Sequence, residues 1–287
     1  MVNISIIIPT YNRAQDLDRC LNSLCEQTYK SFEVIVCDDG SNDHTARIVS
    51  SYESKLQLVY HFSENWGGPA VPRNLGIRYS KAPWICFLDS DDWWFPNKLS
   101  NCIEFMSDHD FIFHDVEDYA GSTLIEKKIF PKIFEYLKFA SPKDILWDGN
   151  FIPCSSVCVR KELAEGSFFP EDKDIIALED YFAWLRLFQK KDIRIKHVRM
   201  ALSAYSINVD NISAYNRKYL DRLFSLKKKI RQDLNLDTGK SCLNYVIGVN
   251  LLHLDELEKA RKFFMYSFMN SSSLSIKIKS LFRFFYG

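Results

Sequence analysis

Short apolar runs alternate with segments of helical periodicity over the first two thirds of the chain. Apolar runs bounded by polar or turn residues predict buried strands, and apolar positions three and four residues apart predict amphipathic helices. The predicted strands lie at residues 4–8, 32–37, 56–62, 84–88, 111–114 and 155–160. The predicted helices lie at residues 14–27, 45–52, 72–79, 98–106 and 181–188. This alternation predicts an α/β fold with a doubly wound, mostly parallel sheet.

The last quarter of the chain has a different character. Residues 215–287 contain 14 Lys and Arg against 6 Asp and Glu, whereas residues 1–214 contain 23 against 31. A helical hairpin is predicted at residues 243–267, around Leu254 and Asp255. We therefore expect a main domain of residues 1–214 and a basic helical extension of residues 215–287.

The final segment predicts one more amphipathic helix. Its apolar stripe and the basic residues beside it are Leu274, Ile278, Leu281 and Phe285, with Lys277, Lys279 and Arg283. A stripe of this kind fits a helix that lies on a membrane surface, and it also fits a helix that packs on the protein's own core. The sequence leaves both interpretations open.

Composition narrows the class of protein. The 287 residues are 47% hydrophobic and 26% charged, which is typical of a globular chain, and a formal net charge of zero gives no indication of nucleic acid binding. The eight cysteines form no CxxC pair, which favours free buried thiols in a reducing compartment. Neither a signal peptide nor a membrane-spanning stretch is apparent, so we expect a cytoplasmic protein.

Polar residues follow three of the predicted strands at the point where each ends. Thr10, Tyr11 and Asn12 follow the first strand, Asp38 and Asp39 follow the second, and the segment 89–92 follows the fourth. Ligands of parallel α/β sheets bind outside the carboxyl ends of the strands. We therefore expect these three clusters to converge on one binding site.

The richest cluster is FLDSDDWW, in which Asp89, Asp91 and Asp92 fall within four positions. Carboxylates this close repel one another and are costly to desolvate, and a divalent cation such as Mg²⁺ or Mn²⁺ would relieve both costs. The alternative is an exposed acidic turn that caps the next helix. Spacing alone favours neither, but the buried strand before the cluster and the tryptophans after it favour a metal site.

Two further positions have plausible ligand chemistry. A carboxylate of the DDGSND segment after the second strand could accept a uracil N3–H, although this segment also fits a simple turn and helix cap. Arg73 follows the Gly67-Gly68 bend, which suits recognition of phosphate, although a surface arginine on a helix is the commoner explanation.

Taken together, the ordered motifs resemble those of a known enzyme family. They are PTYNR at 9–13, VCDDGSND at 36–43, GGPAVPRNLGI at 67–77, FLDSDDWW at 87–94 and LED at 178–180. This set closely resembles the family 2 glycosyltransferases, which have the GT-A fold, and the similarity covers about residues 3–214. The resemblance implies inverting transfer of a sugar from a UDP-sugar donor with the help of Mn²⁺ or Mg²⁺.

The resemblance also assigns roles to individual residues of this chain. For the uridine of the donor it implies contacts from Pro9, Tyr11 and Asp39, with Asp38 beside them. For the diphosphate it implies a contact from Arg73. Asp89, Ser90 and Asp91 match the family's Asp-x-Asp motif, and Asp91 or Asp92 would bind the metal.

Asp180 matches the family's catalytic base, which would take the proton of the acceptor hydroxyl. It also fits a helix-capping position, where the helix dipole favours the ionised carboxylate, so the two roles are compatible. One departure concerns the segment Tyr205–Ser213, in which family members often carry a histidine where this chain has Asn208. Asn208 cannot supply an imidazole ligand, and the third contact to the metal or diphosphate would have to be weaker or come from elsewhere.

Similar bacterial enzymes build O-antigen or capsule, and by analogy we expect a lipid-linked saccharide acceptor and a location at the inner face of the cytoplasmic membrane. Two alternatives remain. A nucleotidyltransferase should show a glycine-rich loop with a basic residue after the first strand, where this chain offers only Arg13. A non-catalytic module that binds nucleotide sugars is favoured by Asn208, while Asp91, Asp92 and Asp180 argue against it.

Overall fold

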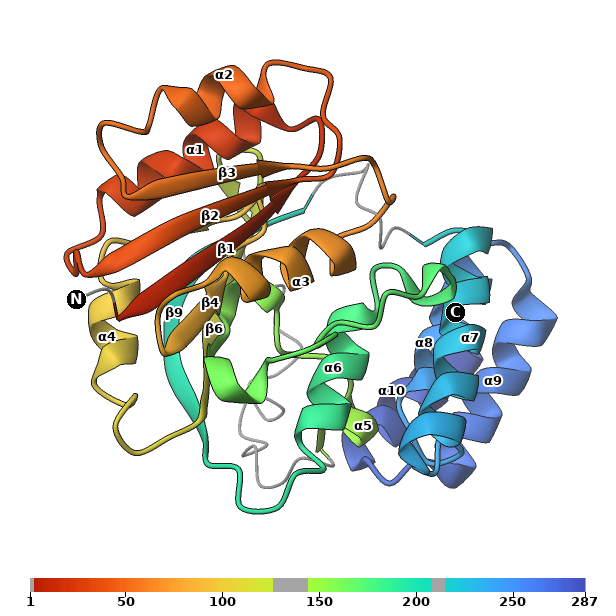
Figure 1. Ribbon diagram of the computed structural model, residues 1–287. Coiled ribbons are helices and arrows are strands. Elements are labelled where there is room, and N and C mark those ends of the chain that lie inside the picture. Colours follow the sequence, from red (N-terminus) through yellow and green to blue (C-terminus); the bar gives the residue numbers. More distant parts are fainter. Residues whose placement is uncertain (1–2, 126–143, 208–214, 287) are drawn as a thin grey trace. The chain divides into compact units, whose positions relative to one another are not determined.

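The computed structural model describes residues 3–125, 144–207 and 215–286 (Figure 1). The chain forms two compact units, and both are built from segments that alternate along the sequence. The first unit comprises residues 1–127, 152–171 and 192–208, and the second comprises residues 128–151, 172–191 and 209–287. The division into domains at residue 214 stays a prediction.

The first unit is built on one mixed, mostly parallel sheet. Across the sheet the strands are β3 (Leu58–Phe62), β2 (Phe32–Asp38), β1 (Ile4–Thr10), β4 (Trp84–Phe87), β8 (Cys158–Arg160), β6 (Phe111–Ala120), β9 (Ile195–Ser206) and β5 (Trp93–Trp94), while β7 (Thr123–Leu124) pairs with β6. Strands β3, β2, β1 and β4 run parallel, β8 runs antiparallel to both of its neighbours, and β6 and β9 pair in parallel. The predicted α/β class is confirmed.

Helices cover both faces of the parallel half of the sheet (Figure 1). Alternate residues of β1, among them Ile6 and Ile8, pack with α1 (Ala14–Cys25), α2 (Thr45–Ser50) and α4 (Lys98–Ile103) in one apolar core.

On the other face, α3 (Ala70–Tyr79) comes unusually close to the sheet. A Cβ atom on Gly76 would lie 2.4 Å from Cγ2 of Ile7, so only glycine permits this approach. Close packing of α3 brings Arg73, one turn earlier in the helix, to the carboxyl edge of the sheet.

Sequence periodicity missed or misjudged several elements. Strands β5 and β9 were not predicted, and β6 continues to Ala120, well beyond the predicted end at residue 114. The strand predicted at residues 155–160 is shorter than expected, and only β8 (Cys158–Arg160) forms. The chain first makes the 3₁₀ turn η2 (Cys154–Ser156). The remaining predicted strands and helices of the first unit are confirmed to within a few residues at their ends.

The second unit is helical. Besides α5 (Asp144–Asp148) its α-helices are α6 (Glu179–Leu187), α7 (Arg217–Leu234), α8 (Leu243–His253), α9 (Leu257–Asn270) and α10 (Leu274–Tyr286). Helices α8 and α9 form the predicted hairpin, and Figure 1 shows α7 to α10 side by side. Within the described ranges, no helix combines the length and the apolar character that crossing a membrane requires. All eight cysteines are free, as expected, and every one except Cys25 is buried.

Candidate functional site

The carboxyl ends of β1, β2 and β4 bring together the residues that were predicted to converge. Pro9 and Thr10 end β1, and the backbone N–H of Asp39 donates to the carbonyl of Thr10 at 2.9 Å. The N–H of Leu88, one residue before the aspartate cluster, donates to the carbonyl of Ile7 at 3.0 Å. The parallel pairing of β2–β1–β4 therefore continues into the loops that carry the polar side chains.

Asp89 forms a partly buried ion pair with Arg73. Arg73 Nη2 lies 2.6 Å from Asp89 Oδ1, and the arginine side chain is only 4% exposed. The guanidinium also lies over the ring of Phe169, 5.2 Å from the ring centroid. Arg73 is thus held on two sides, and it presents a fixed positive charge at the edge of the sheet.

Asp91 has a different arginine as its partner. Arg13 Nη1 lies 2.7 Å from Asp91 Oδ2, and these two side chains are 26% and 20% exposed. Arg19 donates to the backbone carbonyl of Asp91 at 2.7 Å and lies over the ring of Trp93. Burial raises the pKa of the Asp91 carboxyl and the charge of Asp89 adds to this, while the neighbouring Arg13 lowers it; the net direction is upward.

Asp92 is buried and accepts its hydrogen bonds from uncharged donors, so that it acts as a brace between strands. Its Oδ2 accepts a hydrogen bond from Ser155 Oγ at 2.5 Å, and its Oδ1 accepts one from the backbone N–H of Ser206 at 2.8 Å. Burial raises the pKa of this carboxyl well above its usual value, and the charges of Asp91 and Asp89 raise it further. Coordination of a metal by Asp92 stays a prediction, because both of its oxygens already hold η2 and β9 to the end of β4.

Ser155 joins two members of the cluster. Its Oγ donates to Asp92 and also accepts the backbone N–H of Asp89 at 3.0 Å, while its carbonyl accepts the indole N–H of Trp94 at 2.8 Å. Ser90, the middle residue of the Asp-x-Asp motif, is buried. No motif of the sequence analysis indicated this function of Ser155.

The carboxylates that follow β2 are also buried and fixed. Asp38 accepts hydrogen bonds from the backbone N–H of Ser41 at 2.8 Å and from Tyr60 Oη at 2.6 Å. Asp39 accepts the N–H groups of Trp66 and Gly67 at 2.8 and 3.0 Å. Each carboxylate oxygen has two lone pairs, so Asp39 retains the capacity to accept one more N–H.

Tyr11 differs from its neighbours because its side chain is 47% exposed beside the buried carboxylates. An exposed aromatic ring at the edge of the sheet is free to pack against a planar base.

Asp180 belongs to the second unit, in the first turn of α6. Its Oδ1 accepts the backbone N–H of Tyr181 at 2.6 Å, and Asn150 Nδ2 donates to its Oδ2 at 3.3 Å. Both contacts orient the carboxylate at the N-terminus of the helix. Asn208, at the position where the family often has histidine, lies outside the described residues.

Two other side chains, of Trp184 and His197, have structural environments. Trp184 is fully buried in the core. His197 stacks on Phe113 and its Nε2 lies 2.7 Å from Asp115 Oδ1, which agrees with a structural histidine.

A metal at this site would take only part of its coordination from the protein and the rest from water and substrate oxygens. Among the described residues, no group of three or more His, Cys, Asp and Glu side chains is arranged to hold a metal ion. Magnesium, however, is commonly held by one or two carboxylates together with phosphate oxygens and water. Asp91 is a partly exposed carboxylate at the sheet edge and meets that requirement, with Asp89 two residues away.

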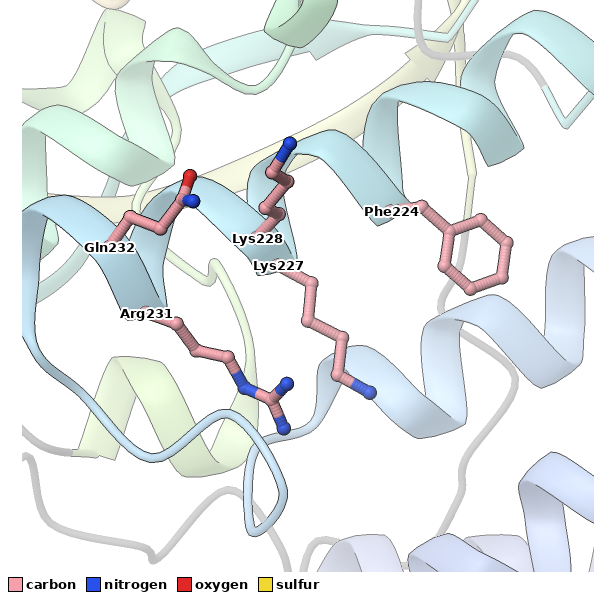
Figure 2. Close-up of a pocket in the computed structure, with 5 residues that line it drawn as sticks. All are labelled: Phe224, Lys227, Lys228, Arg231 and Gln232. Carbon is pink, nitrogen blue, oxygen red and sulfur yellow. The ribbon is translucent and has the colours of Figure 1, made fainter.

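The second unit has a basic hollow of its own on α7. Its volume is about 450 Å³, and it is lined by Phe224, Lys227, Lys228, Arg231 and Gln232. Figure 2 shows Lys227 and Arg231 reaching to one side of the helix. Burial lowers the pKa of Lys227, and the charge of Arg231 lowers it further. None of the predicted site residues lines this hollow.

Comparison with known proteins agrees with this arrangement. The family model of glycosyl transferase family 2 matches residues 5–165. UDP-Glc:alpha-D-GlcNAc-diphosphoundecaprenol beta-1,3-glucosyltransferase WfgD of Escherichia coli is 29% identical over 222 residues, which cover 76% of this chain and 83% of WfgD. An uncharacterized glycosyltransferase of Rickettsia typhi is 39% identical over 247 residues, which cover 83% of this chain and 76% of that protein.

Solved structures share the fold. The Staphylococcus aureus TarS 1–349 complex with UDP-GlcNAc has a TM-score of 0.62 at 22% identity, covering 99% of this chain and 80% of that chain. Mannosyltransferase PcManGT of Pyrobaculum calidifontis, in complex with GDP-Man and Mn²⁺, has a TM-score of 0.61 at 18% identity, covering 96% of this chain and 78% of that chain.

Replacing Ser155 should test the brace around Asp92. We expect Ser155→Ala to lower the free energy of unfolding by about 1–3 kcal/mol, because a buried carboxylate loses a hydrogen-bond donor. Ser156→Ala is the matched control, since Ser156 is equally buried but its hydroxyl donates to the carbonyl of Pro153. Urea unfolding of both variants measures the difference, and equal losses of stability would contradict the role given to Ser155.

Proposed function

The chain belongs to glycosyl transferase family 2, and from this premise we propose that it is an inverting, metal-dependent enzyme that moves a sugar from a UDP-sugar to a hydroxyl group of a lipid-linked saccharide. The observation that carries the proposal is the grouping of two arginine–aspartate pairs and the buried Asp39 at one edge of a parallel sheet. This edge offers a hydrogen-bond acceptor for a base and positive charge for a diphosphate.

On the donor side, Asp39 accepts the uracil N3–H, and Tyr11 and Pro9 pack beside the base, with Asp38 fixing the turn below. The amide contacts of Asp39 support this role, since they hold its carboxylate in one direction. Arg73 contacts the diphosphate from its position beside Asp89. WfgD, by its name, uses UDP-Glc, and this supports a uridine nucleotide.

Asp91 would hold a divalent metal, Mn²⁺ or Mg²⁺, with Asp92 as the second predicted ligand, and the metal would supply positive charge at the leaving diphosphate. Asp89 and Ser90 complete the Asp-x-Asp segment. Arg73 places its guanidinium beside the same diphosphate. The protein's own side chain therefore shares in neutralising the negative charge of the leaving group.

Asp180 is the general base in this mechanism. Its carboxylate takes the proton of the acceptor hydroxyl while the hydroxyl oxygen attacks the anomeric carbon from the face opposite UDP. The bond from the anomeric carbon to UDP breaks, a bond to the acceptor oxygen forms, and the configuration inverts. The hydrogen bonds from Tyr181 N–H and Asn150 support this role by orienting the carboxylate.

The acceptor is a saccharide on a lipid carrier, used in the synthesis of a bacterial surface polysaccharide. This rests on the acceptor in the name of WfgD, a diphosphoundecaprenol-linked sugar. An enzyme with such a substrate works at a membrane surface, which for a UDP-sugar donor is the cytoplasmic face.

Helix α10 is the proposed membrane contact. Its apolar stripe is exposed: Leu274 is 72%, Ile278 48% and Phe285 63% accessible. The helix packs on the second unit through the opposite side, where Ile276 and Ser280 are buried. Lysine and arginine flank the stripe and no acid is present on the helix, so its charge complements an anionic lipid surface.

Binding of UDP is the first test. We expect calorimetry to detect UDP binding in the presence of Mn²⁺, and Asp91→Ala to weaken it by on the order of 100-fold, because removing even an outer-shell partner of a metal costs up to about that much. Asp108→Ala, which removes an exposed carboxylate of the same unit, is the control. Absence of UDP binding with and without metal would overturn the assignment of Asp39.

Asp180→Asn should separate chemistry from binding. We expect kcat to fall by about 100- to 10,000-fold with unchanged UDP affinity, because a general base is lost while the donor site is intact. UDP release from UDP-glucose or UDP-N-acetylglucosamine measures turnover, with diphosphoundecaprenol-linked N-acetylglucosamine as acceptor. Asp174→Asn, an exposed carboxylate of the same unit, is the control. Wild-type protein that binds UDP but neither transfers nor hydrolyses the sugar would indicate a non-catalytic binding module.

Charge on the apolar stripe of α10 should release the protein from lipid. We expect Ile278→Glu to lower sedimentation with vesicles of phosphatidylcholine and phosphatidylglycerol by about 10-fold, because burying a side chain of this size contributes about 1.5–3 kcal/mol. Phe62→Glu is the control, since Phe62 is also an exposed apolar side chain but lies on β3 of the first unit. Equal binding of both variants and the wild type would exclude α10 as the contact.

A further inference from the structure

We propose that Arg13 is an exchangeable counter-ion of Asp91, which keeps a divalent metal off this carboxylate until the diphosphate of the donor is bound. The inference rests on the proposed function, and it assigns Arg13 a regulatory position that the sequence motifs do not give it. Arg13 would neutralise Asp91 in the free protein and move to the diphosphate in the loaded protein.

The first observation is that Arg13 already neutralises the carboxylate that a metal would bind. Its Nη1 lies 2.7 Å from Asp91 Oδ2, within the distance of a charge-assisted hydrogen bond. A guanidinium and a divalent cation on one carboxylate repel each other, because like charges a few ångströms apart interact strongly in a partly desolvated site. Binding of the metal is therefore favoured when Arg13 moves away.

The second observation is that the two arginines of the site are held differently. Arg73 is 4% exposed, and its guanidinium lies over the ring of Phe169, so Asp89 has a fixed partner. Arg13 is 26% exposed. Movement of Arg13 costs less desolvation and less packing than movement of Arg73, so the pair at Asp91 is the one that exchanges.

The backbone that carries Arg13 is fixed, which confines the movement to the side chain. Asn12 adopts the left-handed conformation with φ 48°, which its short polar side chain tolerates. Its N–H donates to Ser41 Oγ at 2.8 Å, and its Oδ1 accepts the N–H of Asn42 at 2.8 Å. On the far side of Arg13, the N–H of Ala14 donates to Asp43 Oδ2 at 3.0 Å.

Arg13 also has a second carboxylate within reach. Its Nη1 lies 3.7 Å from Asp16 Oδ2, so the guanidinium keeps a counter-charge when it leaves Asp91. Arg19 meanwhile donates to the backbone carbonyl of Asp91 at 2.7 Å and holds the main chain in place. A phosphate matches the forked donors of a guanidinium, so the donor diphosphate is the third partner available to Arg13.

Exchange at Asp91 makes metal and nucleotide bind cooperatively. The metal alone must compete with the charge of Arg13 at Asp91, whereas with UDP present the guanidinium gains the diphosphate as a new partner. Coupling of this kind is reciprocal and is typically about 5- to 150-fold in affinity. Removing Arg13 should therefore strengthen binding of the metal alone and reduce the coupling.

The test measures Mn²⁺ binding without nucleotide, from the electron paramagnetic resonance signal of the free ion. We expect Arg13→Gln to bind Mn²⁺ about 10-fold more tightly than the wild type, and addition of UDP to raise the Mn²⁺ affinity of the variant less than that of the wild type. The matched control is Arg194→Gln, which also takes an arginine from an aspartate, since Arg194 Nη2 lies 2.7 Å from Asp110. It should bind Mn²⁺ as the wild type does.

Mn²⁺ binding by Arg13→Gln that equals or falls below that of the wild type would overturn the inference, and so would absence of Mn²⁺ binding in both. Equal gains in Arg13→Gln and Arg194→Gln would also overturn it, because the effect would then be one of net charge. Tighter Mn²⁺ binding by Arg13→Gln in a protein that never binds UDP would support exchange at Asp91 and contradict the donor assignment. Thermal unfolding checks that each variant is folded.

Discussion

Three carboxylates within four positions of the chain are the constraint around which the first unit is arranged. Asp89, Asp91 and Asp92 leave a buried strand together, and each would be unstable if it were desolvated alone. The structure gives each a different kind of partner: a buried arginine, a partly exposed arginine, and a pair of uncharged hydrogen-bond donors. The pKa values of Asp91 and Asp92 are nevertheless raised, so the cluster retains a demand for positive charge.

The need of the three carboxylates for hydrogen-bond and ion-pair partners explains features of the fold that the parallel sheet alone does not require. Arg73 reaches Asp89 because α3 packs against β1 at Gly76. Strand β9 ends at Ser206, where its backbone N–H meets Asp92, and η2 brings Ser155 to the same carboxylate. The antiparallel and added strands thus deliver donors to an acidic edge, and the site and the sheet are stabilised by the same hydrogen bonds.

The sequence predicts those features of this arrangement that depend on residues close together along the chain. Continuous apolar runs identified the parallel strands, and the polar residues just after them gave the position of the site. The partners of the carboxylates were not predictable in this way, because Arg13 and Ser206 are 78 and 114 positions from Asp91 and Asp92. Strand β9 was missed for a related reason: its mixture of polar and apolar residues gives neither a buried run nor a helical period. Family resemblance supplied the order of the motifs, but not the hydrogen bonds that occupy Asp92.

The acidic body, residues 1–214, and the basic tail, residues 215–287, differ in how their charged side chains are paired. In the acidic body, arginines meet aspartates directly, and little positive charge is left over at the site. In the basic tail some cations are also paired, such as Lys229 with Asp172 and Asp233. Lys227, Lys228 and Arg231, however, line a hollow that has no acid in its lining, although like charges four residues apart destabilise a helix. Helix α10 carries basic residues and no acid. The proposed contact with an anionic lipid surface would supply counter-charge to α10.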